Sequence, residues 1–229
     1  MKELFIICGG KGTRIKKILN ETPKILAKIN GLVFLSFLDK YFYQKNIKKL
    51  ILCTGFGHES IVTYLNSARL NCEIILSKEE KPLGTGGALK KAINYTSQNE
   101  IAAINGDTII DVNLEKMNLA HIKNKANLTI NIIKKASNKN QGGILIDSKN
   151  RVLSFSEKNP GNTDYVNTGV YIINKKLLES YNKNIFSLEE DFFPEIVSKK
   201  NAYGYISNKN KFLDFGTEEG YKNISKFII

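Results

Sequence analysis

Short apolar runs alternate with helix-like stretches through the first half of the chain, and this alternation constrains the fold more than any other feature. Four of the runs are nearly continuous, which is typical of strands buried on both faces of a sheet. They cover residues 3–8, 50–54, 72–76 and 101–105. The stretches between them carry apolar side chains at helical spacing over residues 33–45, 58–68 and 86–95. Strand and helix in turn predict right-handed crossovers and a mostly parallel sheet with helices on both faces.

The second half follows a different pattern, because its short strands are separated by turns rich in Asn, Ser, Gly and Lys. The expected strands cover residues 128–134, 143–146, 152–156, 165–173, 203–206 and 212–215. Helical spacing recurs over residues 175–181, 188–199 and 218–227. Because no Pro- or Gly-rich linker divides the chain, we expect one domain over residues 1–229, with a front half at 1–125 and a back half at 126–229.

The net charge of +12 does not by itself predict a nucleic-acid-binding protein. Of the 34 basic residues, 31 are lysines, spread along the chain without a long block or an accompanying aromatic stripe. No apolar run approaches the roughly 20 residues that cross a bilayer, and the N-terminus has no signal-peptide pattern. Cys8, Cys53 and Cys72 lack C-x-x-C spacing and lie in apolar runs, which indicates buried, reduced thiols. We therefore expect a cytoplasmic protein with no membrane or nucleic-acid partner.

A glycine-rich loop directly follows the first expected strand. Residues 8–14 read CGGKGTR, and three glycines in four positions allow a sharp turn that brings backbone N–H groups against a ligand. A phosphate group is the natural ligand for such a loop. The spacing matches neither the P-loop pattern G-x-x-x-x-G-K-[ST] nor the dinucleotide pattern G-x-G-x-x-G, because Arg14 and Ile15 break the latter. Standing alone, the loop could also be a turn that binds nothing.

Further along, Pro23 is followed by Lys24, which the fixed ring of the proline can hold facing the glycine loop. Together the loop and this pair resemble the sugar-1-phosphate nucleotidylyltransferases, whose loop reads G-G-x-G-T-R and is followed by Pro-Lys. The family usually has a second proline where this chain has Ile25. We interpret that difference as a change in backbone stiffness, because the charged group is kept.

Later segments resemble the same family in the same order. They read EEKPLGTGGA at 79–88, NGD at 105–107, FSEK at 155–158, NTGVY at 167–171 and LDFGT at 213–217. Two departures concern the sugar end of the site. Asn159 separates Lys158 from the proline that the family places directly after its Glu-Lys pair, and Gly143 stands where the family has a Tyr-Gly pair. The resemblance runs from Leu4 to Tyr221, nearly the whole chain.

The resemblance implies a GT-A-like nucleotidyltransferase fold of the α/β class, with a Rossmann-like nucleotide-binding half and a smaller β-rich, sugar-binding part. It implies transfer of a nucleotidyl group from a nucleoside triphosphate to a sugar 1-phosphate, with release of pyrophosphate. The expected catalytic residues are Arg14, Lys24 and Lys158, and the expected Mg²⁺ ligands are Asp107 and Asp214. Nucleotide contacts are expected from Gly9, Gly10, Gly12, Thr13, Glu80, Gly84 and Thr85, and sugar contacts from Gly143, Glu157, Asn167 and Thr168.

Within the family, the runs PLGTGGALKKA and NGDTIIDVNL look most like guanylyltransferases that make GDP-activated D-glycero-α-D-manno-heptose for capsule or surface-layer glycans. Glu80 suits this base, because a carboxylate can accept from the N1–H and N2–H₂ groups of guanine. UTP-, dTTP- and CTP-dependent enzymes acting on hexose 1-phosphates share the scaffold and remain alternatives. A noncatalytic nucleotide-sugar-binding protein and a basic RNA-binding protein are alternatives from other classes. The aromatic-rich back half is compatible with a homo-oligomer.

Other polar residues are interpreted as structural. His58 and His121 fall on helix-like segments, and no partner with metal-ligand spacing accompanies them. Residues 187–190 read SLEE, which is typical of a helix N-cap followed by acidic residues in the first turn. We expect these positions to stabilise helices or to lie at the surface, with no part in the chemistry.

Overall fold

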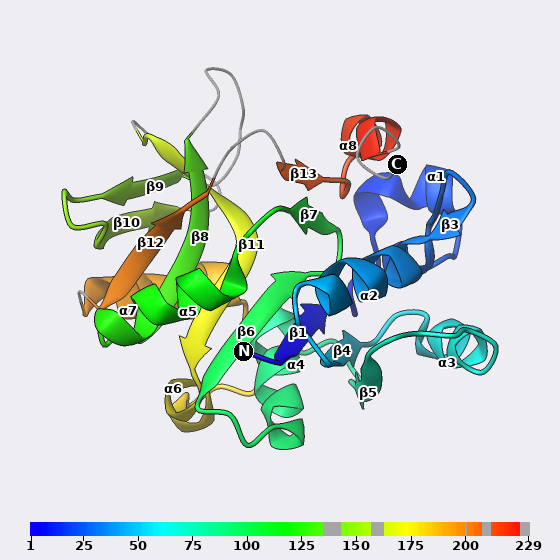
Figure 1. The fold of residues 1–229 in the computed structure, drawn as a ribbon, viewed down its shortest axis with the longest axis horizontal. Helices are drawn as coiled ribbons and strands as arrows, with labels where there is room; N and C mark the ends of the chain where they lie inside the picture. Colours follow the sequence, from blue (N-terminus) through cyan, green and yellow to red (C-terminus); the bar gives the residue numbers. More distant parts are fainter. Residues whose placement is uncertain (135–142, 157–162, 200, 208–211, 225–229) are drawn as a thin grey trace.

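A computed structural model describes residues 1–134, 143–156, 163–199, 201–207 and 212–224, and it contains one nine-stranded sheet (Figure 1). Its main path runs β10-β9-β11-β6-β1-β4-β5, and β8 and β12 join beside β11. The strands are β1 (Glu3–Ile7), β4 (Lys49–Thr54), β5 (Glu73–Lys78), β6 (Glu100–Asn105), β8 (Leu128–Lys134), β9 (Gly143–Ile146), β10 (Val152–Ser156), β11 (Tyr165–Asn174) and β12 (Ala202–Ile206). Two small ribbons pair β2 (Lys28–Ile29) with β3 (Leu32–Val33) and β7 (Thr108–Ile110) with β13 (Phe212–Asp214).

The four strands of the front half are parallel, as the sequence predicts. Strand β1 lies between β4 and β6, and Ile7 at its end is in register with Cys53 and Asn105. The carboxyl ends of the three strands therefore meet at one edge of the sheet. In open parallel sheets this edge is where ligands bind.

Strand β11 connects the two halves of the sheet. Its second part pairs antiparallel with β6, and its first part pairs with β9. Along its other edge β11 pairs with β8, which in turn pairs parallel with β12. Because β11 pairs with β6 of the front half and with β8 and β9 of the back half, the back half continues the front half's sheet.

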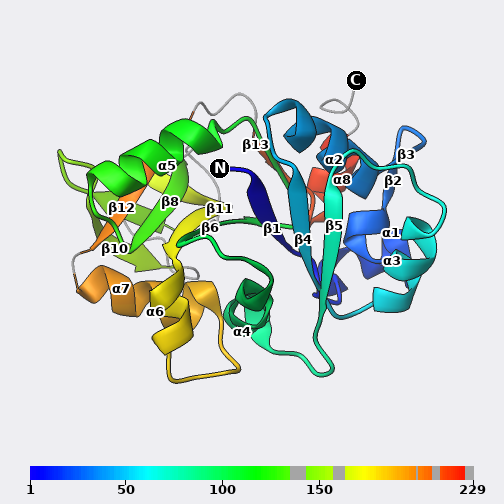
Figure 2. The same cartoon turned by 60° about the horizontal axis from the view of Figure 1, so that its bottom comes forward.

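Helices cover both faces of the sheet (Figure 2). The α-helices are α1 (Lys16–Leu19), α2 (Phe34–Gln44), α3 (His58–Leu65), α4 (Gly84–Ala92), α5 (Leu114–Lys123), α6 (Lys175–Ser180), α7 (Phe193–Ser198) and α8 (Glu218–Ile224). Short turns of other helix types are η1 (Thr13–Ile15), η2 (Lys24–Leu26), η3 (Ile93–Tyr95) and the π-helical η4 (Leu188–Phe192). In the described ranges no helix is long and apolar enough to cross a membrane.

Alternate residues of the parallel strands supply the two cores. Leu4 and Ile6 of β1 pack in the cluster that contains Phe34 and Leu38 of α2. Phe5 faces the other way, into the cluster that contains α4 and α7. A strand alternates its side chains between two faces, so a nearly continuous apolar strand needs a core on each side.

The expected elements agree with the structure within a few residues, with differences that tertiary contacts explain. Strand β13 falls within the strand expected at 212–215, whereas β7 and its pairing with β13 were not predicted, because the two strands have three residues each and lie far apart in the sequence. His121 lies on α5 as expected, but it is 1% exposed and therefore not a surface residue. Its Nδ1 shares a hydrogen bond with the Thr129 hydroxyl at 2.8 Å, and its Nε2 is 2.8 Å from Oε2 of Glu100. Cys53 and Cys72 are buried, and all three cysteines are free thiols.

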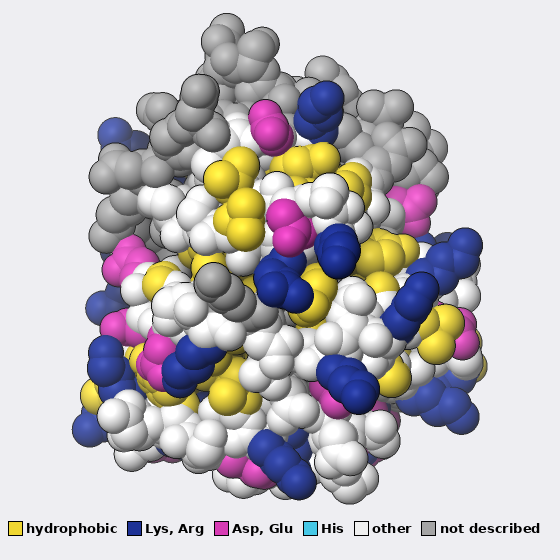
Figure 3. Space-filling view, turned by 90° about the vertical axis from the view of Figure 1, so that its left-hand side faces the viewer, with side chains coloured by type: hydrophobic (Ala, Val, Ile, Leu, Met, Phe, Trp, Pro, Cys, Tyr) yellow, Lys and Arg dark blue, Asp and Glu magenta, His cyan; other side chains and the backbone are white. Residues whose placement is uncertain are grey.

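Among the described residues, basic side chains form no continuous stripe on the face over β9, β10 and β12. In Figure 3 the Lys and Arg side chains of that face are scattered among apolar and uncharged groups. Leu153 of β10 and Ile206 of β12 are exposed apolar residues. This face therefore does not carry the continuous basic patch that the RNA-binding alternative would require of it.

Candidate active site

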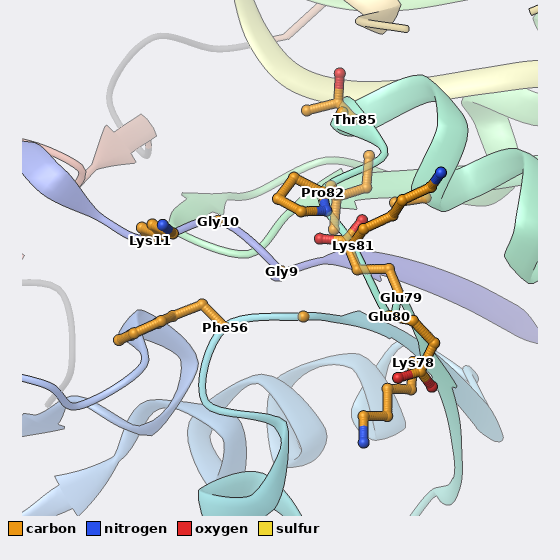
Figure 4. Close-up of a pocket in the computed structure, with 14 residues that line it drawn as sticks. Gly9, Gly10, Lys11, Phe56, Lys78, Glu79, Glu80, Lys81, Pro82 and Thr85 are labelled. Carbon is orange, nitrogen blue, oxygen red and sulfur yellow. The ribbon is translucent and has the colours of Figure 1, made fainter. Parts of the chain in front are cut away.

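A pocket of about 540 Å³ opens at the carboxyl edge of the parallel strands (Figure 4). Its walls come from the glycine-rich loop, the loop after β4 and the segment that leads into α4. The lining residues include Gly9, Gly10, Lys11, Phe56, Glu79, Glu80, Pro82, Gly84 and Thr85. Five residues predicted to contact the nucleotide therefore line one cavity, namely Gly9, Gly10, Glu80, Gly84 and Thr85.

Glu79 is the carboxylate at the back of this pocket, a position that sequence reasoning did not assign. Its Oε1 lies 2.8 Å from where a Cβ on Gly9 would be, and its Oε2 accepts a hydrogen bond from the Leu83 N–H at 3.0 Å. Burial raises the pKa of this carboxyl group. The neighbouring Glu80 lines the pocket but is exposed. Sequence gives no means of distinguishing the two, since β5 ends just before them at Lys78.

Lys24 lies against the glycine-rich loop. Gly12 has a φ of 59°, and a Cβ there would be 3.0 Å from Cε of Lys24. The lysine begins the turn η2, with Pro23 buried before it and Ile25 fully buried after it. Ile25, which replaces the family's second proline, thus anchors the turn by packing into the core.

Lys24 also meets the two aspartates predicted to bind metal. Its Nζ is 2.6 Å from Oδ2 of Asp107. A Cβ on Gly216 would be 2.9 Å from Oδ2 of Asp107, 2.9 Å from Oδ1 of Asp214 and 3.2 Å from Nζ of Lys24. The three charged groups therefore surround one glycine.

The β7–β13 ribbon brings the aspartates together. Asp214 is in register with Thr108, and the Phe215 N–H donates to the carbonyl of Asp107 at 3.1 Å. The Asp214 carboxylate also accepts a hydrogen bond from the Gly216 N–H at 2.7 Å. Two residues more than a hundred positions apart are thus held at fixed positions by backbone pairing.

The pKa of Asp214 is raised, although the residue as a whole is exposed. The larger cause is loss of water around the carboxyl group, and the next is the negative charge of Asp107. The Gly216 N–H, Lys24 and Arg14 oppose the shift. Arg14, which is exposed beside this group, therefore contributes positive potential to the same site.

The two carboxylates suit a hard divalent cation. Mg²⁺ is commonly held by one or two carboxylates together with substrate phosphates, and repulsion between like charges is what such an ion relieves. The described residues contain no group of three or more His, Cys, Asp and Glu side chains that could hold a metal on its own. A metal at this pair would need further oxygen ligands from substrate or water.

Three of the four predicted sugar contacts lie on described strands beyond β6. Asn167 and Thr168 are on β11, and Gly143 begins β9 in register with Val166. The Thr168 hydroxyl is buried and donates to the carbonyl of Asn131 at 3.0 Å. Glu157 and Lys158 fall outside the described residues, so their predicted roles remain predictions.

The family described as nucleotidyl transferase matches residues 4–229. D-glycero-alpha-D-manno-heptose 1-phosphate guanylyltransferase of Aneurinibacillus thermoaerophilus is 37% identical over 225 residues, covering 98% of this chain and 97% of that protein. The protein of the same description from Campylobacter jejuni is 33% identical, covering 96% of each chain. The crystal structure of HddC from Yersinia pseudotuberculosis complexed with GMP-PN superposes with a TM-score of 0.88 at 28% identity, covering 100% of both chains.

The chain belongs to the nucleotidyl transferase family. This confirms the family and the α/β fold class predicted from the glycine loop and the later segments.

Proposed function

We propose that this protein transfers a guanylyl group from GTP to D-glycero-α-D-manno-heptose 1-phosphate, forming GDP-heptose and pyrophosphate. The observation that carries the chemistry is the meeting of Lys24, Asp107 and Asp214 beside the glycine loop. The choice of substrates rests on the two heptose 1-phosphate guanylyltransferases that match this chain over nearly its whole length. The product would serve capsule or surface-layer glycan synthesis.

Two polyanions must approach each other in this reaction, so the protein's task is to position them and to neutralise charge. The amides of Gly9, Gly10 and Gly12, with Thr13, would hold the triphosphate and the departing pyrophosphate. Arg14 would stabilise the same negative charge. The exposure of Arg14 beside the loop leaves its guanidinium able to meet a phosphate.

Lys24 would stabilise the charge that develops at the α-phosphate. In the free protein its ammonium pairs with Asp107, so this cation is already held in place before substrate arrives. Preorganised charge of this kind lowers a barrier because no reorganisation is needed during the reaction. No nucleophilic side chain is required, since a sugar phosphate oxygen attacks the α-phosphorus directly.

Asp107 and Asp214 would hold Mg²⁺, which when bound supplies positive charge to the phosphate oxygens. The raised pKa of Asp214 supports this assignment, because a cation between the carboxylates would remove the repulsion that contributes to the shift. Lys158 would meet the sugar phosphate, and Glu157, Asn167, Thr168 and Gly143 would contact the sugar.

Base choice would depend on the acidic segment that enters α4. Glu80 is the expected partner for guanine, with Gly84 and Thr85 alongside it in the pocket. Glu79 is less suited to this role, because its carboxylate is packed against the glycine loop and already accepts a hydrogen bond from Leu83. Glu80→Gln should therefore lower turnover with GTP more than it lowers turnover with UTP.

Pyrophosphate release provides the direct test. GTP, ATP, UTP, dTTP and CTP would each be combined with a panel of hexose and heptose 1-phosphates in the presence of Mg²⁺. We expect turnover with GTP and the heptose 1-phosphate to exceed every other pair. Preference for UTP, dTTP or CTP with a hexose 1-phosphate would overturn the substrate assignment, but the protein would still be a sugar-1-phosphate nucleotidylyltransferase.

Failure to turn over any pair would favour a noncatalytic nucleotide-sugar-binding protein. Such a protein would still bind nucleotide sugars in a calorimetric titration. An RNA-binding protein would instead bind RNA with an affinity that falls steeply with salt and ignores Mg²⁺ and sugar phosphates.

We also propose that residues 1–229 act as one domain in the cytoplasm. One hydrogen-bonded sheet passes through both halves, and the three cysteines are free thiols, as suits a reducing compartment.

A further inference from the structure

A buried carboxylate, Glu189, connects the nucleotide side of the site with the sugar side. The residue is 9% exposed and lies in η4. Its Oε2 accepts hydrogen bonds from the hydroxyls of Thr85 at 2.7 Å and Ser187 at 3.1 Å. Its Oε1 accepts one from the hydroxyl of Tyr171 at 3.1 Å. The local sequence predicts only an acidic residue in the first turn of a helix. It cannot show that Glu189 is buried, because the residues that bury it are distant in the chain.

On the sugar side, the direction of each hydrogen bond follows from a backbone donor. The Gly169 N–H can only donate, and it donates to Oδ1 of Asn167 at 2.9 Å. The amide Nδ2 of Asn167 therefore faces the Tyr171 oxygen, to which it donates at 2.8 Å. The Tyr171 hydroxyl accepts that bond and directs its own proton to Glu189.

On the nucleotide side, the same logic starts from another backbone donor. The Leu188 N–H donates to Oγ1 of Thr85 at 2.9 Å. The Thr85 hydroxyl therefore directs its proton away from Leu188, to Oε2 of Glu189. Both chains of hydrogen bonds run toward Glu189 and end on different oxygens of one carboxylate.

Only an ionised carboxyl group offers two oxygens that both accept and never donate. Glutamine would present an NH₂ group to one chain, and the hydroxyl there would have to reverse. The hydroxyl oxygens could still accept from Asn167 and from the Leu188 N–H, but the hydroxyl that faced the NH₂ group would lose the acceptor for its own proton. The orientation of Asn167 and the placement of Thr85 thus depend on the same side chain.

The backbone beside Glu189 also holds the start of α4. The carbonyl of Phe186 accepts hydrogen bonds from the N–H groups of Gly86 at 3.0 Å and Gly87 at 3.2 Å. A shift of the segment that carries Glu189 would therefore move the pocket wall to which Gly84 and Thr85 belong.

We propose that Glu189 is a positioning residue that orients Asn167 for the sugar and Thr85 for the nucleotide, and so couples the binding of the two substrates. The inference rests on the proposed function, which places those two residues in contact with substrate. Burial of a carboxylate among hydroxyl groups is unfavourable compared with apolar packing, so stability alone does not account for it.

The first test compares Glu189→Gln with Glu190→Gln, the adjacent and exposed acidic position. We expect Glu189→Gln to lower kcat/KM at least about tenfold for GTP and for the sugar 1-phosphate, through KM of both substrates. Glu190→Gln should stay within about twofold of the wild type. A lower Tm with both KM values unchanged would show a purely structural role and overturn the proposal.

The second test asks whether the coupling passes through Glu189. Thr85→Val should raise KM for the sugar 1-phosphate, although Thr85 belongs to the nucleotide side. In a Glu189→Gln background, Thr85→Val should raise this KM by less than about twofold, because the hydrogen-bonded connection is already broken. An equal effect in both backgrounds would overturn the proposal.

A third measurement needs no turnover and separates this inference from the proposed function. Amide hydrogen exchange at Gly169 in the ligand-free protein should become at least about tenfold faster in Glu189→Gln and remain unchanged in Glu190→Gln. Unchanged exchange at Gly169 in Glu189→Gln would overturn the positioning role. Absence of turnover in the wild type, with the exchange effect present, would instead contradict the proposed function alone.

Discussion

At the scale of single residues, the most consequential contact is the 2.6 Å ion pair between Lys24 and Asp107. Each side chain is about one-fifth exposed, so the pair is shielded from water but open to a ligand. An ion pair of this kind would hold the lysine at the site while leaving it able to exchange partners when a triphosphate binds. In the proposed reaction, Lys24 would thus pair with Asp107 in the free protein and with a phosphate group in the substrate complex.

Removal of the Lys24 ammonium should therefore affect catalysis far more than folding. We expect Lys24→Ala to lower kcat by at least roughly a hundredfold, as loss of preorganised charge does elsewhere. Steady-state pyrophosphate release measures the effect, and circular dichroism checks the fold. Lys17→Ala, at an exposed position on α1, is the matched control.

Asp107→Ala should give a loss of similar size, because it removes one of the two carboxylates proposed to hold Mg²⁺. Calorimetric titration with Mg²⁺ and GTP should show weaker metal binding. A near-wild-type rate in either variant would mean that the reacting phosphate binds elsewhere.

His121 should make stability depend on pH. Burial lowers its pKa to about 4 from 6.5, so between these values the unfolded chain binds a proton that the folded chain does not. The contribution of His121 is complete above pH 6.5 and is lost as pH falls through 4. Relative to His121→Asn, the wild-type free energy of unfolding should fall by up to roughly 3 kcal/mol over this range.

Urea unfolding at several pH values measures this difference. Glu100, whose pKa burial raises, contributes with the opposite sign and is present in both proteins. Comparison of the two proteins cancels that contribution to first order. Identical pH slopes would show that His121 does not titrate in this window.

At the scale of elements, the approach between α4 and the segment before η4 explains the glycines that begin the helix. A Cβ on Gly86 would collide with the ring of Phe186, and one on Gly87 would collide with the carbonyl of Asn184. The helix start that lines the pocket is therefore shaped by close contact with a segment a hundred residues away.

Gly86→Ala should destabilise the protein by about 1–3 kcal/mol, as overpacking of a core does. The obstacle is the ring of Phe186, so a smaller side chain at position 186 should relieve the collision. In a Phe186→Leu background we expect the cost of Gly86→Ala to fall below about 1 kcal/mol. Chemical unfolding of the four proteins measures the cycle, and additive costs would show that the ring is not the obstacle.

At the scale of the whole molecule, the candidate nucleotide pocket is formed by three separate segments, so a bound nucleotide should stabilise the fold globally. At a hundredfold excess over Kd, GTP with Mg²⁺ should add about 2.7 kcal/mol, or roughly 5–10 °C in Tm for a chain of this size. Thermal unfolding measures the shift. UTP and CTP at the same concentration should give smaller shifts, and an equal response to all would show that the pocket does not select a base.

The sequence alone was sufficient for the fold class, the order of most elements and the family. These depend on local patterns, since the periodicity of apolar residues, the turn-forming glycines and the order of short motifs are all present in neighbouring residues. It also indicated that Lys24, Asp107 and Asp214 share a site, through resemblance to a family whose motifs they match.

Only the tertiary structure decided where each acidic side chain lies and which groups it contacts. Glu79 and Glu80 are adjacent in the chain, yet one packs against the glycine loop and the other lines the pocket in the open. Glu189 resembles an ordinary first-turn residue until β11 and α4 close around it. Such differences depend on contacts between residues far apart in sequence, and strand register and packing of the whole sheet determine those contacts.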